Sequence, residues 1–282
     1  MPLREALNTA LDRFAATKVP SPRLNAETLL MFALSCDRAY LYAHPERELT
    51  LEEQRRYDDA IAQRSRGIPT QYITGHQEFW GMDFIVSPAV LIPRPETEHV
   101  IEKVLKIIGD RARTASLRIV DVGTGSGCIA LALAKELPQA EIHATDVSAA
   151  ALEIARINAA RLELAHRVQF HEADLLAGRG ANSCDFVVSN PPYVGESEAD
   201  EVQLEVRKFE PRQAVFAGPS GLEVIERLIP QAQRALEPGG WLVFEISATI
   251  SARIPDLLQS WTQVQIINDL QNIPRVVSAR KH

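Results

Sequence analysis

From Arg118 onward the sequence alternates short apolar runs, rich in β-branched residues, with longer stretches of helical periodicity. Such alternation is typical of parallel strands joined by crossover helices, which must cover the faces of the sheet. It predicts an α/β fold with a mostly parallel sheet and helices on both faces. The pattern predicts strands over 118–122, 141–145, 168–171, 185–189 and 241–246, and helices over 128–137, 148–162 and 221–236.

The C-terminal part has a different pattern. It predicts a helix near 250–260 and strands near 263–269 and 275–281. Only Gln271-Asn272-Ile273-Pro274 separates the two strands, which is too short for the crossover that parallel neighbours need. The sheet is therefore expected to end in an antiparallel strand.

Residues 1–70 are predicted to be all-helical and to form a small bundle, because helices this short must bury their apolar stripes against one another. Ser21 is placed as an N-cap before Pro22, the first residue of a helix. Thr50 and Glu53 have the spacing of a capping box. The apolar spacing predicts helices over 3–14, 22–35 and 51–67.

Residues 71–95 are predicted to be a β-hairpin linker that leads into a domain spanning 96–282. The stretches 72–75 and 79–86 are rich in β-forming residues and are interrupted by glycine. The stretch 91–98 follows, and its two prolines should hold the backbone extended before the next helix.

A glycine-rich turn follows the first predicted strand of the sheet. Asp121-Val122 runs into Gly123-Thr124-Gly125-Ser126-Gly127, which opens the next helix, so the backbone can approach a ligand closely. A dinucleotide fingerprint has glycine or alanine three places after its second glycine, and Cys128 stands there instead. This residue disfavours a nicotinamide or flavin cofactor.

Acidic residues accompany three successive strands. Asp121 precedes the glycine-rich turn, Asp146 ends the next strand, and Asp174-Leu175 follows the third. Asp146 is placed to accept hydrogen bonds from both hydroxyls of a ribose, and Asp121 would disfavour a pyrophosphate and favour a cation. The pattern suits a nucleoside bound through its ribose and adenine, although an isolated aspartate at a strand end is also a common helix cap.

The segment Ser189-Asn190-Pro191-Pro192-Tyr193 follows an apolar strand. Its two prolines fix two φ angles and remove two donors, which makes the Pro191 carbonyl a rigid acceptor. Asn190 adds a side-chain oxygen and Tyr193 a flat apolar face. Together they could hold both hydrogens of a planar –NH2 group, which predicts a pocket for a nitrogen nucleophile. A plain turn is the alternative for these residues taken alone.

Charge and cysteine content argue against several classes of protein. The net charge is −7, and residues 76–282 hold twenty basic against twenty-seven acidic side chains, so no basic face for nucleic acid is expected. Cys36, Cys128 and Cys184 lack the spacing of a disulfide framework or a zinc site. No apolar run is long enough to span a membrane, and the first residues do not have the pattern of an export signal. We expect a cytoplasmic protein.

The glycine-rich turn, Asp146 and Asn190-Pro191-Pro192-Tyr193 together resemble the class I S-adenosylmethionine-dependent methyltransferases, in which Asn-Pro-Pro-Tyr marks enzymes that methylate a planar nitrogen. Further stretches resemble one family of this class, the bacterial-type release-factor glutamine methyltransferases. The resemblance spans nearly the whole chain and includes the helical N-terminal part and residues 91–98, 205–212, 217–222 and 273–277.

The resemblance implies S-adenosylmethionine as cofactor, no metal, and a protein substrate, the glutamine of the Gly-Gly-Gln loop of peptide chain release factors. Asn190 and the Pro191 carbonyl would orient the amide, with Pro192 and Tyr193 completing the substrate pocket and Tyr193 acting by packing. No dedicated general base is assigned. The candidate cofactor residues are Asp121, Gly123, Thr124, Gly125, Ser126, Gly127, Asp146, Asp174, Leu175 and Asn190.

Two other functions remain open at this stage: a DNA adenine-N6 methyltransferase and a non-catalytic S-adenosylmethionine-binding module. The bundle is expected to dock the substrate protein, and the chain to act as a monomer. The family usually follows the last parallel strand with Glu-Ile-Gly and a glutamine three places on, whereas this chain has Glu245-Ile246-Ser247 and Ile250. Glu245 would either close the substrate pocket or cap the next helix.

Overall fold

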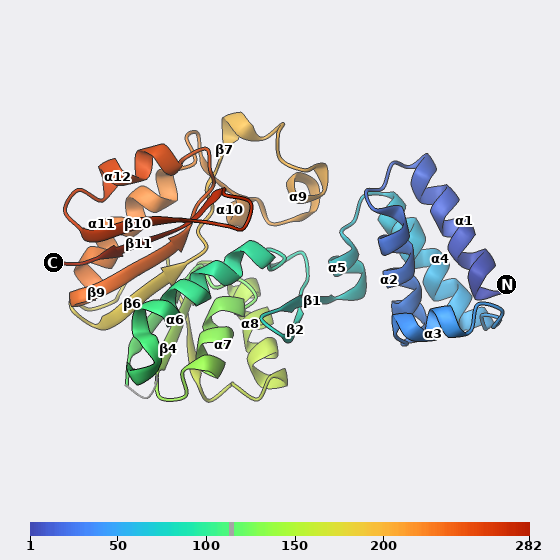
Figure 1. Cartoon of the computed structure of the whole chain (residues 1–282), viewed down its shortest axis with the longest axis horizontal. Coiled ribbons are helices and arrows are strands. Elements are labelled where there is room, and N and C mark those ends of the chain that lie inside the picture. The colour runs from blue at the N-terminus through green and yellow to red at the C-terminus, as the bar shows by residue number, and fades with distance from the viewer. Residues whose placement is uncertain (113–115) are drawn as a thin grey trace. The chain divides into compact units, whose positions relative to one another are not determined.

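The computed structural model describes residues 1–112 and 116–282. These residues form two compact units, Met1–His76 and Gln77–His282. Figure 1 shows the elements of each unit in the order of the chain. Within the described residues, no helix is both long and apolar enough to cross a lipid bilayer.

The first unit is a helical bundle whose core contains the fully buried side chains of Phe14, Leu29 and Leu30. The capping box is confirmed, because Thr50 Oγ1 accepts from Glu53 N and the Glu53 carboxylate accepts from Thr50 N. The helices are α1 (Leu3–Ala16), α2 (Pro22–Leu34), α3 (Arg38–Ala43), α4 (Leu51–Ser65) and α5 (Thr70–Thr74).

Two details of this unit differ from the sequence-based expectation. Ser21 precedes α2 but makes no side-chain cap, because its backbone is left-handed, with φ of 46°. The prediction of β structure over 72–75 is wrong, because residues up to Thr74 are helical. The amides of Tyr72 and Ile73 both donate to the Pro69 carbonyl. These local bonds outweigh the β-propensity of the side chains.

The second unit begins with a β-hairpin, which lies within the stretch 71–95 where the sequence predicted one and has Trp80 and Gly81 at its turn. Both turn residues have positive φ, 54° and 65°, which is the backbone of a tight hairpin turn. The next segment contains a single 3₁₀ turn before a long helix. The elements are β1 (His76–Phe79), β2 (Met82–Ile85), η1 (Pro95–Thr97) and α6 (Glu98–Ala112).

The main sheet has seven strands within the described residues, in the order β10-β11-β9-β6-β3-β4-β5. The five strands from β9 to β5 in this order are parallel. Strand β11 runs antiparallel to both β9 and β10, as the short connection predicted. The strands are β3 (Arg118–Val122), β4 (Glu141–Asp146), β5 (Val168–Glu172), β6 (Cys184–Ser189), β9 (Leu236–Glu245), β10 (Thr262–Asn268) and β11 (Pro274–Arg280).

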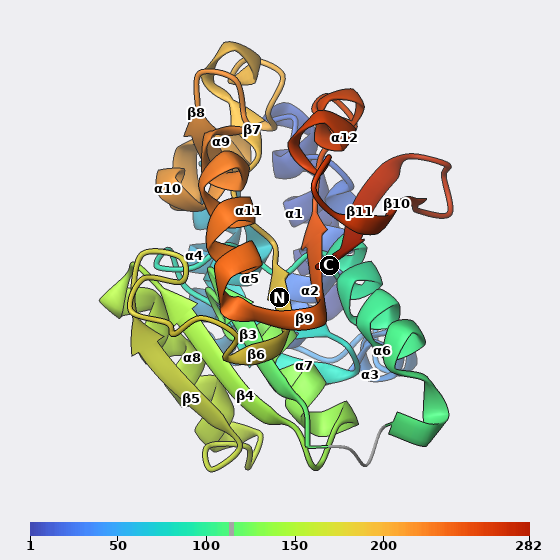
Figure 2. The ribbon, with the colours of Figure 1, turned by 90° about the vertical axis from the view of Figure 1, so that its left-hand side faces the viewer.

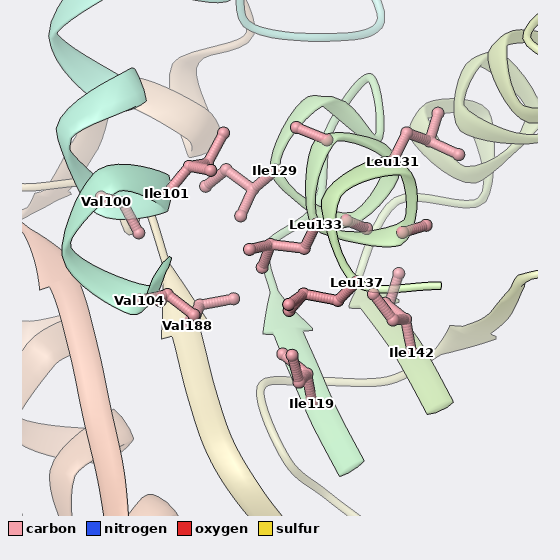
Figure 3. Close-up of a cluster of buried hydrophobic side chains, with 14 of the residues drawn as sticks. Val100, Ile101, Val104, Ile119, Ile129, Leu131, Leu133, Leu137, Ile142 and Val188 are labelled. Carbon is pink, nitrogen blue, oxygen red and sulfur yellow. The ribbon is translucent and has the colours of Figure 1, made fainter. Parts of the chain in front are cut away.

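Alternate residues of the strands serve two separate cores, one on each face of the sheet. Ile119 and Val188 pack under α6 and α7, as Figure 3 shows, whereas Val120 and Val187 pack under α11 and α12. Both faces are therefore buried, which explains the near-continuous apolar strands. The covering helices are α7 (Cys128–Glu136), α8 (Ala149–Arg161), α11 (Glu223–Ala235), η3 (Ser251–Arg253) and α12 (Ile254–Leu257).

The chain order reverses at β3, which pairs with β4 on one side and β6 on the other. In open α/β sheets, ligands bind beyond the carboxyl ends of the strands at such a point. Between β6 and β9 the chain also makes a small excursion that the sequence did not predict, seen beside α11 in Figure 2. It contains β7 (Val194–Gly195), η2 (Glu196–Glu198), α9 (Leu204–Phe209), α10 (Arg212–Val215) and β8 (Phe216–Gly218).

Candidate active site

A cavity of about 430 Å³ lies at this reversal point, within the size range of small-molecule sites. Most of the candidate residues line it: Gly123, Thr124, Gly125, Ser126, Asp146, Asp174, Leu175, Asn190 and Pro192. The lining does not include four others: Asp121, Gly127, Pro191 and Tyr193.

The glycine-rich turn presents backbone to the cavity. Gly123 and Gly125 have φ of 72° and 55°, and a Cβ added at either position would meet no protein atom within 4 Å. Glycine is therefore needed there for its backbone conformation, and the space beyond it is left for a ligand. Gly127 differs, because a Cβ there would lie 3.2 Å from Leu131 Cδ1 and 3.3 Å from Ala155 Cβ, so this glycine allows α7 to pack closely.

Asp121 supports the turn from inside the protein. It is fully buried, and its Oδ2 accepts from Thr124 Oγ1 at 2.6 Å and from Ala130 N at 3.2 Å. Its Oδ1 has no partner among the described residues. Burial raises the pKa of the Asp121 carboxyl to about 7. The side chain fixes the turn and the start of α7 instead of facing the cavity.

Asp146 links the turn to the next helix. Its Oδ2 accepts from Gly125 N and its Oδ1 from Ser148 N, each at 2.9 Å. Burial raises the pKa of this carboxyl, although the hydrogen bonds from the two backbone amides lower it. Since a carboxylate oxygen has a second lone pair, Asp146 can hold the turn and still accept hydrogen bonds from a ligand in the cavity.

Asp174 carries an ion pair with Arg227 Nη2, and both residues line the cavity. The adjacent Leu175 is held in place by its carbonyl, which accepts from Thr145 Oγ1 at 2.9 Å. Sequence reasoning missed Arg227, because nothing along the chain links a residue in the middle of α11 to the end of β5.

Asn190 begins a chain of side-chain hydrogen bonds that the sequence did not predict. Asn190 Nδ2 donates to Thr97 Oγ1 at 3.0 Å, and Thr97 Oγ1 donates to Glu245 Oε2 at 2.6 Å. The other carboxylate oxygen of Glu245 accepts from the Tyr193 hydroxyl at 2.9 Å. Glu245 therefore binds two side chains of the site and does not cap the next helix.

Glu245 is almost completely buried, and Tyr193 is partly buried beside it. Burial raises the pKa of the Glu245 carboxyl, against the opposing hydrogen bonds of Thr97 and Tyr193 and the positive charge of Arg275. Burial also raises the pKa of the Tyr193 hydroxyl well above its usual value. Tyr193 therefore stays protonated and serves as a hydrogen-bond donor.

Two segments that are far apart in sequence form the remaining walls of the cavity. A buried carboxylate joins them: Glu210 Oε2 accepts from Ile92 N at 3.1 Å, and its Oε1 pairs with Arg94. The lining from these segments comprises Ala89, Val90, Leu91 and Pro93 on one side and Pro211, Gln213, Ala214 and Phe216 on the other. The apolar side chains suit a ligand with an aromatic or aliphatic part.

The positions that depart from the usual family pattern lie beyond this hydrogen-bond chain. Ser247 Oγ and Thr249 Oγ1 lie 2.8 Å apart, and Thr249 donates to Glu198 Oε2 at 3.2 Å. Ile250 is buried in the core under α11 and α12. Neither Ser247 nor Ile250 lines the cavity.

Two family models match this chain. The model of the PrmC N-terminal domain matches residues 5–75, and the model of the methyltransferase small domain matches residues 104–208. A release factor glutamine methyltransferase of Koribacter versatilis is 54% identical over 282 residues, covering 100% of this chain and 99% of the relative. A protein of the same name from Chlorobaculum tepidum is 43% identical, covering 97% of this chain and 95% of the relative.

Solved structures share the fold at lower identity. A 16S rRNA methyltransferase from T. thermophilus, in complex with AdoMet and guanosine, has a TM-score of 0.55 at 18% identity and covers 73% of this chain and 50% of its own. A ribosomal protein methylase from Lactobacillus delbrueckii subsp. bulgaricus has a TM-score of 0.50 at 24% identity and covers 70% and 84%.

Proposed function

This chain belongs to the release factor glutamine methyltransferase family, and from that premise we propose that it methylates the side-chain amide nitrogen of a glutamine in a peptide chain release factor. The observation that carries the proposal is the identity of 54% over the full chain, which includes both the helical unit and the sheet unit. The methyl donor is S-adenosylmethionine, and the enzyme acts in the cytoplasm as a monomer on the Gly-Gly-Gln loop.

The residues at the cavity fit S-adenosylmethionine. The turn at Gly123 and Gly125 leaves open space above its backbone, and Asp146 offers two carboxylate oxygens to ribose hydroxyls. Asp174 and Leu175, which line the same cavity, would hold the adenine ring. When bound, this cofactor supplies a methyl group that is electrophilic because it is attached to a positively charged sulfur.

The task of the protein is to make an amide nitrogen reactive. The lone pair of this nitrogen is delocalised into the carbonyl group, so the amide must be oriented with the lone pair toward the methyl group. Asn190 Oδ1 and the Pro191 carbonyl are the two acceptors that hold the two N–H bonds of the substrate in the proposed mechanism. Holding the reactants in line provides much of the rate acceleration.

The proton of the nitrogen becomes acidic once the methyl group is attached. It can leave to solvent or a nearby acceptor, and Tyr193 does not take it, because the raised pKa of its hydroxyl keeps it protonated and its hydrogen is directed at Glu245. The Asn190 carbonyl oxygen and the backbone acceptor therefore orient the amide without serving as a base.

The alternatives are disfavoured by the same observations. The curated relatives that match this chain over nearly its full length carry the name of a protein-modifying enzyme, not of a DNA methyltransferase. A non-catalytic binding module would have no need for the ordered contacts of Asn190, Thr97 and Glu245. We further propose that residues 1–70 dock the release factor, because a single glutamine in a loop offers few contacts for selecting one partner.

The test is mass spectrometry of purified release factor incubated with this protein and S-adenosylmethionine. We expect a gain of one methyl group on the glutamine of the Gly-Gly-Gln loop. The Asn190→Ala variant serves as the control for contaminating activity. Methylation of adenine in DNA, or no methylation of the factor, would refute the proposed function.

A further inference from the structure

The carboxamide of Asn190 has two ends of similar shape, a carbonyl oxygen that accepts hydrogen bonds and an –NH2 group that donates them. Only the oxygen can bind the –NH2 group of a substrate amide. If the group turned by 180°, its own hydrogens would face those of the substrate. The protein must therefore fix which end of this side chain faces the cavity.

The hydrogen-bond chain behind Asn190 provides the means. A threonine hydroxyl has one hydrogen, and Glu245 can only accept when its carboxylate is ionised, which is the state in which the lock operates. The 2.6 Å contact therefore uses the one hydrogen of Thr97 on Glu245 Oε2, and Thr97 Oγ1 is left as an acceptor. The end of Asn190 that lies 3.0 Å from it must then be the –NH2 group.

The other partner of Glu245 supports this assignment of hydrogens. The Tyr193 hydroxyl is 2.9 Å from Glu245 Oε1 and is held in its protonated form, so it donates to the carboxylate as Thr97 does. Each oxygen of the Glu245 carboxylate thus accepts one hydrogen bond from a hydroxyl group. Both the threonine and the carboxylate are almost completely buried, with 1% exposure each, so water cannot readily replace either donor.

From this geometry we propose that Thr97 and Glu245 are positioning residues that lock the Asn190 carboxamide with its oxygen toward the cavity. Neither residue needs to touch the reacting atoms. The inference rests on the proposed function in taking the acceptor to be an –NH2 group. It adds a reason for the chemical selectivity of the site: a carboxylate substrate such as glutamate would face the fixed Asn190 oxygen and be repelled.

Three variants test the proposal. Thr97→Val keeps the shape of the side chain but removes the hydroxyl, which frees Asn190 to turn. Thr97→Ser retains the hydroxyl. Tyr193→Phe is the matched control, because it also deprives Glu245 of one O–H donor but leaves the bond between Thr97 and Asn190 intact.

The first readout is kinetic, with intact release factor as substrate. We expect kcat to fall about 10- to 100-fold in Thr97→Val, the scale of loss for a misplaced reacting group. Binding of S-adenosylmethionine, measured by calorimetry, should be unchanged. Thr97→Ser should restore most of kcat, and Tyr193→Phe should lose less than Thr97→Val. Equal losses in Thr97→Val and Tyr193→Phe would overturn the proposal, because they would reflect only the unsatisfied carboxylate.

The second readout needs no substrate. In protein with ¹⁵N-labelled asparagine, the side-chain –NH2 resonances of Asn190 are identified by their loss in Asn190→Ala. We expect slow hydrogen exchange for this group in the wild type and Thr97→Ser, and fast exchange in Thr97→Val. Equal exchange rates in all three proteins would refute the lock. A wild type that shows the lock but does not methylate the release factor would instead refute the proposed function.

Discussion

Replacing Asp146 by asparagine should weaken cofactor binding and also lower the stability of the fold. In the structure the two carboxylate oxygens accept from Gly125 N and Ser148 N, each at 2.9 Å. Their remaining lone pairs are the proposed partners of the two ribose hydroxyls. Asparagine keeps one oxygen and replaces the other with –NH2, which cannot accept from a hydroxyl or from a backbone amide.

The size of the effect follows from the number of bonds removed. A hydrogen bond to a charged group contributes about 1.5–3 kcal/mol, and the variant loses one such bond to the ribose. The dissociation constant of S-adenosylmethionine should therefore rise about 10- to 150-fold. The variant also loses the bond to one backbone amide, so a loss of about 1–3 kcal/mol in unfolding free energy is expected without any ligand.

Calorimetry with S-adenosylmethionine measures the affinity, and thermal unfolding without ligand measures the stability. Glu172→Gln is the matched control: Glu172 pairs with Asp146 across β4 and β5, is exposed, and does not line the cavity. It makes the same change of charge beside the site. If both variants bind the cofactor as tightly as the wild type, Asp146 does not hold the ribose and acts only as a brace for the turn.

Three further results are expected. Asn190→Ala should abolish methyl transfer and leave calorimetric binding of S-adenosylmethionine intact; transfer near the wild-type rate would exclude its role. As the pH falls, kcat should drop when Glu245 becomes protonated. This drop should occur at a higher pH than for an ordinary glutamate, because burial raises the pKa of Glu245. If the Glu245→Gln variant has the same pH profile as the wild type, Glu245 is not the cause of the drop. Removing residues 1–75 should raise KM for intact release factor far more than KM for a short Gly-Gly-Gln peptide; equal increases would argue against docking.

The sheet could be predicted from sequence because its signals are local. Each strand is a short apolar run, and the glycine-rich sequence that begins at Gly123 marks the end of β3. The excursion between β6 and β9 gave no such signal. Its strands β7 and β8 have two and three residues, which are too few to show a periodicity in the sequence. These strands form because they pair with each other.

The site was predicted in part for the same reason. Asn190 and Asp146 could be found because they follow apolar strands directly. Thr97 and Glu245 are 148 positions apart, so no spacing rule connects them. Asp121 was assigned to the cofactor from its place before the turn, but it belongs to the set of β3 side chains that includes Ile119 and faces the buried side of α7. Only the folded sheet shows which side chains of a strand end reach the cavity.

The burial of Glu245 explains why the departures from the family pattern need not impair the site. A buried carboxylate must have its oxygens satisfied, and Thr97 and Tyr193 do this from segments that precede the departures. Ile250 meets an apolar core, where its side chain is 3% exposed. A glutamine there would need partners of its own, whereas isoleucine needs none. The orientation of Asn190 therefore depends on residues that this chain retains.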